Sequence, residues 1–250
     1  MLQANSCRSC AIRHTGICSG CGANDLRLLE KARYIRSYDA GQPIAWCGDR
    51  MEFVASVMHG SVSLSQTMKD GRNQMVGLLM PPSFLGQPGQ ESSPYDVVAV
   101  DYTVLCCFCR NQFGDLMKEF PHLTDRLLEM SLRELDAARQ WLLVLGCKLA
   151  REKTASFLAV LASREAVAKA LPRTRRIAFD LTISREAIAA CLGLTMETVS
   201  RQITALKNDG IIQLKSARRI VVPDVNRLLR EAGDVPAAPD EGDRAISAIA

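Results

Sequence analysis

The stretch from Ser184 to Arg201 constrains the fold of this chain more than any other part of its sequence. Ser184 stands where it can cap a helix, and the apolar residues 187, 188 and 191 share one face of that helix. Gly193 permits a tight turn, and Thr195 can cap a second helix that begins at Met196. Two short helices joined in this way predict a helix-turn-helix.

The formal charge of +4 is spread unevenly along the 250 residues. Residues 148–232 contain sixteen Lys or Arg and eight Asp or Glu, a net +8, so the rest of the chain carries −4. A positive domain attracts the phosphate backbone of nucleic acids. An ordinary pair of helices with solvated charges would not combine caps, a glycine turn and this excess of charge. The combination predicts double-stranded DNA as the partner of residues 148–232.

The second helix of a helix-turn-helix enters the major groove with its first residues against the base edges. Glu197, Ser200 and Arg201 lie three and four residues apart on one face, and their side chains can bind cytosine, several bases and guanine, respectively. Residues 211–214 and 220–222 are predicted to pair as a hairpin, or wing. The side chains predicted to contact phosphates are Arg185, Thr198, Lys207, Lys215, Arg218 and Arg219.

The middle of the chain changes its hydrophobic period twice. Residues 38–105 alternate with a period of two between turn signals, which indicates short antiparallel strands in a barrel or jelly roll. Residues 23–34 precede them as a predicted helix, with Asn24 as its cap. After Pro121, apolar residues recur close to a heptad seam, which covers either the core of its own chain or a second copy. The members of this seam are Leu128, Leu132, Leu135, Ala138, Leu142 and Leu145.

The N-terminal sequence lacks the apolar run of a secretory signal, and no stretch reaches the roughly 18 apolar residues of a membrane helix. We therefore expect a cytoplasmic protein with no membrane partner. Cysteines in that compartment are reduced, and clusters of them bind metals or perform redox chemistry.

Seven of the ten cysteines form two groups, namely Cys7, Cys10, Cys18 and Cys21 near the N-terminus, and Cys106, Cys107 and Cys109 on a predicted strand. Because side chains alternate along a strand, Cys106 faces one side, whereas Cys107 and Cys109 face the other. The two groups exceed the four thiolates that an iron–sulfur cluster needs, and the two Cys-x-x-Cys pairs could instead close a zinc site. The remaining three are predicted to be small buried hydrophobes, and they are Cys47, Cys147 and Cys191.

Residues 25–222 as a whole resemble the CRP/FNR family of bacterial transcription regulators, and the stretch Leu192 to Arg201 is specific to it. Met196 and Ser200 stand where the CRP branch has Arg and Gly, which is similar to the FNR branch. The resemblance implies an α+β fold divided into a cysteine-rich cluster-binding segment at 1–22, an antiparallel jelly-roll sensor domain at 23–120, a dimerisation helix at 121–146, a winged helix-turn-helix domain at 147–232 and a disordered tail at 233–250.

The resemblance also implies a function: an oxygen-responsive regulator of anaerobic and microaerobic gene expression. In the FNR branch, a homodimer binds a palindrome of TTGAT half-sites and contacts RNA polymerase, so the six seam residues become dimer contacts. A [4Fe–4S] cluster promotes dimerisation under low oxygen. Carried over residue by residue, its ligands are Cys7, Cys10, Cys18 and Cys106, with Cys21 as a substitute for Cys18.

Other ligands and activities are less consistent with the sequence. Cyclic AMP is not expected, because the stretch Gly86 to Pro88 lacks the family's Glu, and Pro94 and Tyr95 stand near the place of its Arg-Ser pair. Haem or another small-molecule effector in the jelly roll, or structural zinc in place of the cluster, remain the alternatives. We find no nucleophile, acid–base pair or phosphate loop in a supporting context, so no enzymatic activity is expected.

Overall fold

The computed structural model describes residues 6–169, 171–172, 176–216 and 218–234. The chain divides into two compact units, residues 1–132 and 133–250. Most of the tail predicted to be disordered, residues 235–250, lies outside the described residues, as do residues 1–5. No helix of the described part is long and apolar enough to cross a membrane.

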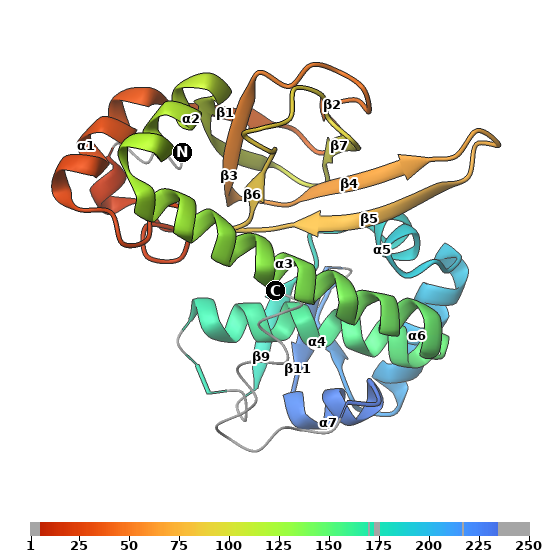
Figure 1. Ribbon diagram of the computed structural model, residues 1–250. Helices are drawn as coiled ribbons and strands as arrows, with labels where there is room; N and C mark the ends of the chain where they lie inside the picture. Colours follow the sequence, from red (N-terminus) through yellow and green to blue (C-terminus); the bar gives the residue numbers. More distant parts are fainter. Residues whose placement is uncertain (1–5, 170, 173–175, 217, 235–250) are drawn as a thin grey trace. The chain divides into compact units, whose positions relative to one another are not determined.

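The first unit contains two four-stranded sheets in a jelly-roll arrangement, so the predicted antiparallel fold is confirmed (Figure 1). One sheet has the order β1-β8-β3-β6 and the other β2-β7-β4-β5. Every pairing within them is antiparallel. The strands are β1 (Arg33–Tyr38), β2 (Pro43–Ala45), β3 (Phe53–His59), β4 (Val62–Thr67), β5 (Asn73–Leu79), β6 (Phe84–Leu85), β7 (Asp96–Ala99) and β8 (Thr103–Cys109).

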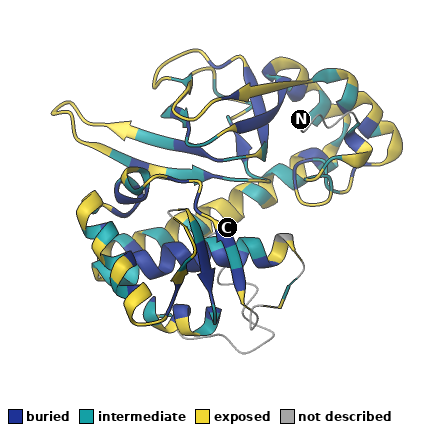
Figure 2. Ribbon diagram, turned by 180° about the vertical axis from the view of Figure 1, so that it is seen from behind, coloured by how far each residue is buried: buried dark blue, intermediate teal, exposed yellow. Residues whose placement is uncertain are grey.

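Strand β8 is covered on both faces, and its first six residues are buried. By contrast, the far end of the β4–β5 hairpin is exposed (Figure 2). Leu105 and Cys107 belong to the core between the two sheets. Cys106 and Phe108 point the other way, into a second core that also contains Phe113 and Leu123 from helices outside the barrel. The period-two alternation of a strand therefore assigns neighbouring cysteines to two different environments.

The described residues of this unit include a short 3-10 helix η1 (Cys7–Ser9), α1 (Ala23–Ala32) and α2 (Arg110–Glu119). Helix α3 (Pro121–Cys147) begins in the first unit and ends in the second. The predicted Asn24 cap of α1 is wrong, because Gly22 is the N-cap and the Asp25 carboxylate accepts its N–H at 2.8 Å. Helix α1 also ends two residues earlier than predicted, since Arg33 already pairs with Phe108 in the sheet. Helix α2 was not predicted from the sequence.

The second unit contains the predicted helix-turn-helix. The Ser184 hydroxyl caps α5 (Arg185–Leu192) by accepting the Ala187 N–H at 3.1 Å, and Gly193 has the left-handed φ of +60° that the turn requires. Thr195 caps α6 (Met196–Asn208) in the same way, so both caps are confirmed. The unit is completed by α4 (Ala150–Ala168), β9 (Ile177–Asp180), β10 (Gln213–Leu214), β11 (Arg219–Val222) and α7 (Val225–Glu231).

The wing is a three-stranded sheet rather than the predicted two-stranded hairpin, because β9 pairs with β11 on the side away from β10. Helix α4 packs against α6, α7 and β9. The buried side chains Ile188, Leu192 and Val199 join the two helices of the motif to this core. The first residues of α6, Met196 and Glu197, are exposed.

Candidate metal centre and nucleic-acid interface

Four thiols line one cavity between the N-terminal segment and the sheet. They belong to Cys7, Cys10, Cys18 and Cys106. The apolar part of its wall includes Ile17, Met58 and Phe108. Ser56, the residue opposite Cys106 in the β3–β8 register, also lines it, and its buried hydroxyl has no hydrogen-bond partner among the described residues. A bound group with sulfur acceptors would give that hydroxyl a partner.

The N-terminal segment, residues 6–22, is held by side chains rather than by regular structure. Ile17 is 1% exposed and anchors the segment in the second core. The Arg13 guanidinium donates to the carbonyl oxygens of Cys18 and Cys21, each at 2.7 Å, and so fixes the turn between them. The Cys7 N–H donates to the Glu30 carboxylate of α1 at 3.3 Å.

Burial disfavours the ionised form of the thiols in this cavity. Burial raises the pKa of Cys106 to about 12, and the neighbouring thiols oppose its ionisation further, although Arg33 acts in the other direction. Burial likewise raises the pKa of Cys18 and of Cys7. Without a metal these thiols are protonated near neutral pH, and four thiolates would be stable together only around metal ions. The donor set fits an iron–sulfur cluster or a tetrahedral zinc ion.

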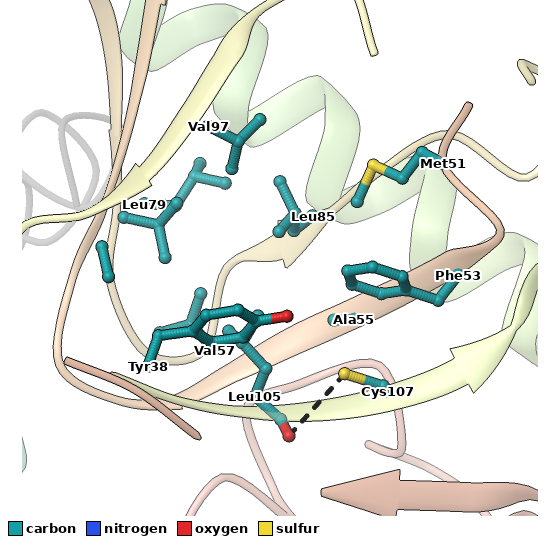
Figure 3. Close-up of a cluster of buried hydrophobic side chains, with 12 residues drawn as sticks. Tyr38, Met51, Phe53, Ala55, Val57, Leu79, Leu85, Val97, Leu105 and Cys107 are labelled. Atoms are coloured by element: carbon teal, nitrogen blue, oxygen red, sulfur yellow. Dashed lines mark hydrogen bonds between the residues drawn. The ribbon is translucent and has the colours of Figure 1, made fainter. Parts of the chain in front are cut away.

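The other two cysteines of β8 lie elsewhere. Cys107 is fully buried between the sheets, where its Sγ lies 3.9 Å from the Leu105 carbonyl oxygen (Figure 3). Burial raises its pKa to about 12. Cys109 stands at the end of β8 opposite Phe53 and is partly exposed. Neither residue lines the four-thiol cavity.

Cys21 also lies outside the lining of that cavity, beside Asp25 and His122. Of the three cysteines predicted to be buried hydrophobes, Cys191 is buried, whereas Cys47 and Cys147 are exposed, so that prediction is wrong for two of them. Cys47 stands at a turn, where its N–H donates to Asp96, and Cys147 is the last residue of α3.

Arg126 connects the N-terminal segment to α3, and this contact could not be predicted from the sequence. Its Nε donates to the Gly16 carbonyl oxygen at 3.2 Å, and its Nη2 donates to the Thr15 carbonyl oxygen. Its third nitrogen pairs with Glu129 one turn further along α3, at 2.6 Å. The loop that carries Cys10 and Cys18 is thereby attached to the first third of α3.

The interior of the jelly roll is occupied by packed side chains. Tyr38, Met51, Phe53 and Leu85 fill the space between the two sheets together with Cys107 (Figure 3). The turn at Gly86 to Gln90, which would approach a nucleotide in cyclic-nucleotide-binding domains, is followed by Glu91, which pairs with the buried Arg110 guanidinium at 3.1 Å.

Helix α6 presents the predicted base contacts at the surface. Glu197 and Arg201 are exposed and Ser200 is partly exposed, all within the first two turns. The Thr198 hydroxyl lies 3.0 Å from that of Thr195 and 3.5 Å from an Arg201 nitrogen, so it lies within the capping network. A recognition helix with its N-terminal half free can enter a groove.

The predicted phosphate contacts differ in availability. Lys207, Lys215 and Arg218 are exposed. Arg219 pairs with Asp180 of β9 at 2.5 Å, and Arg185 is half-buried at the start of α5. Lys207, Lys215 and Arg218, which are exposed and have no ion-pair partner among the described residues, are the stronger candidates for phosphate contacts.

Helix α3 carries an exposed apolar stripe. Leu128 is 58% exposed, Leu132 54%, Leu135 46% and Leu142 70%, while Ala138 is exposed and Leu145 is partly buried. Leu143, which the heptad reading omitted, is also exposed. Stripes of this kind on a soluble protein mark interaction surfaces.

Comparison with known protein families agrees with the jelly-roll domain and with the helix-turn-helix described above. Residues 35–120 match the cyclic nucleotide-binding domain family, and residues 152–231 match the Crp-like helix-turn-helix domain family. The fold and the site therefore define a DNA-binding regulator that joins a domain of the cyclic nucleotide-binding type to a helix-turn-helix.

Individual relatives narrow the class. The chain is 52% identical over 228 residues to the transcriptional activator protein FnrL of Cereibacter sphaeroides, covering 91% of this chain and 92% of that protein. It is 33% identical to the nitrogen fixation regulation protein FixK of Bradyrhizobium diazoefficiens, covering 86% and 90%. The structure of FixK2 from Bradyrhizobium japonicum superposes with a TM-score of 0.70 at 28% identity, covering 82% of this chain and 99% of that one. The chain belongs to the CRP/FNR family of transcription regulators.

Proposed function

We propose that this regulator responds to oxygen, controls anaerobic and microaerobic gene expression, and holds a [4Fe–4S] cluster through Cys7, Cys10, Cys18 and Cys106. The observation that carries the proposal is the cavity that these four thiols share, three from the N-terminal segment and one from β8. Cys21, the substitute ligand in the sequence, lies outside the lining of that cavity, which favours Cys18.

When bound, the cluster supplies oxygen-labile metal–sulfur bonds between the N-terminal segment and β8. The chain's own residues connect this ligation to α3. Ile17 and Arg13 fix the segment, and Arg126 joins its backbone to α3. When the N-terminal segment loses its bonds to the cluster, its backbone at Thr15 and Gly16 becomes less ordered. The first third of α3 then loses the two hydrogen bonds that Arg126 makes to that backbone.

The homodimer is proposed from the apolar stripe of α3. Burying such a stripe against a second copy removes apolar surface from water, and a two-fold dimer matches a TTGAT-type palindrome. FnrL of Cereibacter sphaeroides is named a transcriptional activator. We extend activation to this chain, with RNA polymerase as the partner of the DNA-bound dimer.

The metal proposal is tested by purification without oxygen. A brown protein with about four irons and four sulfides per chain is expected. Cys10→Ser and Cys106→Ser should lose the iron, whereas Cys47→Ser, which changes an exposed cysteine that does not line the cavity, should keep it. A colourless protein whose four cavity thiols hold one zinc ion and no iron would refute the proposal.

The DNA proposal is tested with a TTGAT palindrome before and after exposure to air. Binding should weaken in air together with loss of the dimer. Arg201→Ala should cost about 1–3 kcal/mol and relax the preference at a single base pair, because a bidentate contact to guanine is removed. Lys118→Ala, on the exposed face of α2, serves as the control. An unchanged base preference in Arg201→Ala would refute the assignment of that residue.

A further inference from the structure

We propose a second metal site, formed by Cys21, Asp25 and His122 and suited to a zinc ion. One ligand atom from each residue, a thiol sulfur, a carboxylate oxygen and an imidazole nitrogen, lies within 4.8 Å of the other two. All three residues belong to the first unit of the chain. The site uses the fourth N-terminal cysteine, which does not line the four-thiol cavity.

Three separate segments bring these ligands together. Cys21 lies near the end of the N-terminal segment and is 4% exposed. Asp25 lies in the first turn of α1, and His122 lies in the first turn of α3, almost a hundred residues further along the chain. Core packing holds α1 and the start of α3 together, because Leu123, next to His122, is fully buried in the same cluster as Leu26 of α1.

Two hydrogen bonds orient the segment around Cys21. The Cys21 N–H donates to the Cys18 carbonyl oxygen at 3.2 Å, and the Arg13 guanidinium donates to the Cys21 carbonyl oxygen at 2.7 Å. The Gly22 N–H donates to Asp25 Oδ2 at 2.8 Å and holds that carboxylate at the start of α1. A site whose ligands are positioned before the metal arrives loses less conformational entropy on binding.

The imidazole of His122 supplies the observation that points to a ligand. Its Nε2 is buried and makes no hydrogen bond to any described residue. Asp25 Oδ2 lies 3.4 Å from this nitrogen, which is too long for a strong hydrogen bond. A buried polar atom without a partner is costly, and a metal ion between the imidazole, the carboxylate and the thiol would satisfy it.

The donor chemistry selects the ion. Zinc accepts sulfur, nitrogen and oxygen ligands together, whereas iron–sulfur clusters are held by thiolates. Bond lengths of about 2.0–2.3 Å place tetrahedral ligands about 3.3–3.8 Å apart, so the three donors need only approach by about 1 Å. A thiolate and a carboxylate balance the two charges of the ion, and water completes the fourth position.

Zinc here would attach the end of the N-terminal segment to α1 and to the start of α3. This attachment does not depend on Cys7, Cys10, Cys18 or Cys106. If the four-thiol cavity holds the proposed cluster, loss of its bonds loosens Thr15 and Gly16 but leaves the segment attached at Cys21, so the cavity can be refilled without refolding the whole segment. Only this consequence rests on the proposed function.

The test is metal analysis of the full chain, purified without oxygen, equilibrated with zinc and desalted. About one zinc per chain is expected in addition to the iron. Cys21→Ser and His122→Gln should lose the zinc and keep the iron, whereas Cys10→Ser should lose the iron and keep the zinc. His14→Gln, which changes an exposed histidine of the same segment, should keep both.

Each outcome has a separate meaning. A protein that contains iron but no zinc overturns this site and leaves the cluster proposal standing. A protein that contains no iron but holds zinc in a His122-dependent way supports this site and overturns the cluster proposal. Zinc that is lost in Cys10→Ser but not in His122→Gln belongs to the four-thiol cavity and also overturns this site.

A second measurement does not require the cluster. In the chain with serine at Cys7, Cys10, Cys18 and Cys106, cobalt(II) should bind with the charge-transfer absorption of a single cobalt–thiolate bond, and Cys21→Ser should abolish that band. A spectrum that is unaffected by Cys21→Ser would overturn the site. Far-ultraviolet circular dichroism identifies any variant that fails to fold, and His122→Gln, at a partly exposed side chain, then provides the comparison.

Discussion

Replacing Arg126 by methionine removes the two hydrogen bonds that this side chain makes to the N-terminal segment while keeping most of its apolar stem. The Arg126 side chain is 14% exposed, so its guanidinium is largely withdrawn from water. A hydrogen bond from a charged donor contributes about 1.5–3 kcal/mol, but Thr15 is exposed and water can replace the lost donor there. We therefore expect the free energy of local opening of the segment to fall by about 2 kcal/mol, or about 30-fold in the opening equilibrium.

Amide hydrogen exchange of the metal-free, reduced chain measures this opening without interference from bound metal. The informative amides are those of Gly16, which donates to the Ile12 carbonyl at 2.8 Å, and of Cys21. Arg126→Lys keeps the charge but not the forked geometry of the guanidinium. Its exchange rates should therefore lie between those of the wild type and of Arg126→Met. Arg27→Met, on the exposed face of α1, is the control. An increase of less than about threefold in Arg126→Met, or an equal increase in Arg27→Met, would contradict the reasoning.

Three further predictions concern single positions. Cys106→Ala should abolish iron binding, whereas Cys107→Ala should keep the iron and lower the free energy of unfolding by about 1 kcal/mol. Iron analysis measures the first effect and urea denaturation the second. Gly60→Ala should destabilise by more than about 3 kcal/mol, because φ is +79° and the new Cβ would lie 2.3 Å from a backbone oxygen, whereas Gly48→Ala, with φ of +90° and open space, should cost about 1–2 kcal/mol. Burial raises the pKa of Cys191 from 9.0 to about 12, so its contribution to stability is complete below pH 9 and is lost as the pH rises from 9 toward 12. Between pH 8 and 10 the wild type should lose about 1 kcal/mol of stability that Cys191→Ala does not lose, and parallel slopes of stability against pH would contradict this.

The sequence by itself determined the parts of this protein that depend on neighbours in the chain. The caps at Ser184 and Thr195 and the left-handed turn at Gly193 involve hydrogen bonds and backbone angles within a few residues, so they could be predicted. The alternation of β8 likewise separates Cys106 from Cys107 by a purely local rule. The jelly-roll class followed from the period of residues 38–105.

Only the tertiary structure decided which distant residues meet. The contact of Arg126 with Thr15 and Gly16 and the approach of His122 to Cys21 join residues about a hundred positions apart, and no local pattern carries that information. Strand β9 likewise depends on the tertiary structure, because its four residues form their strand hydrogen bonds with β11, about forty residues further along the chain. A short strand or a ligand set is stable only after the rest of the fold has placed its partners, so its residues look ordinary until the chain is folded.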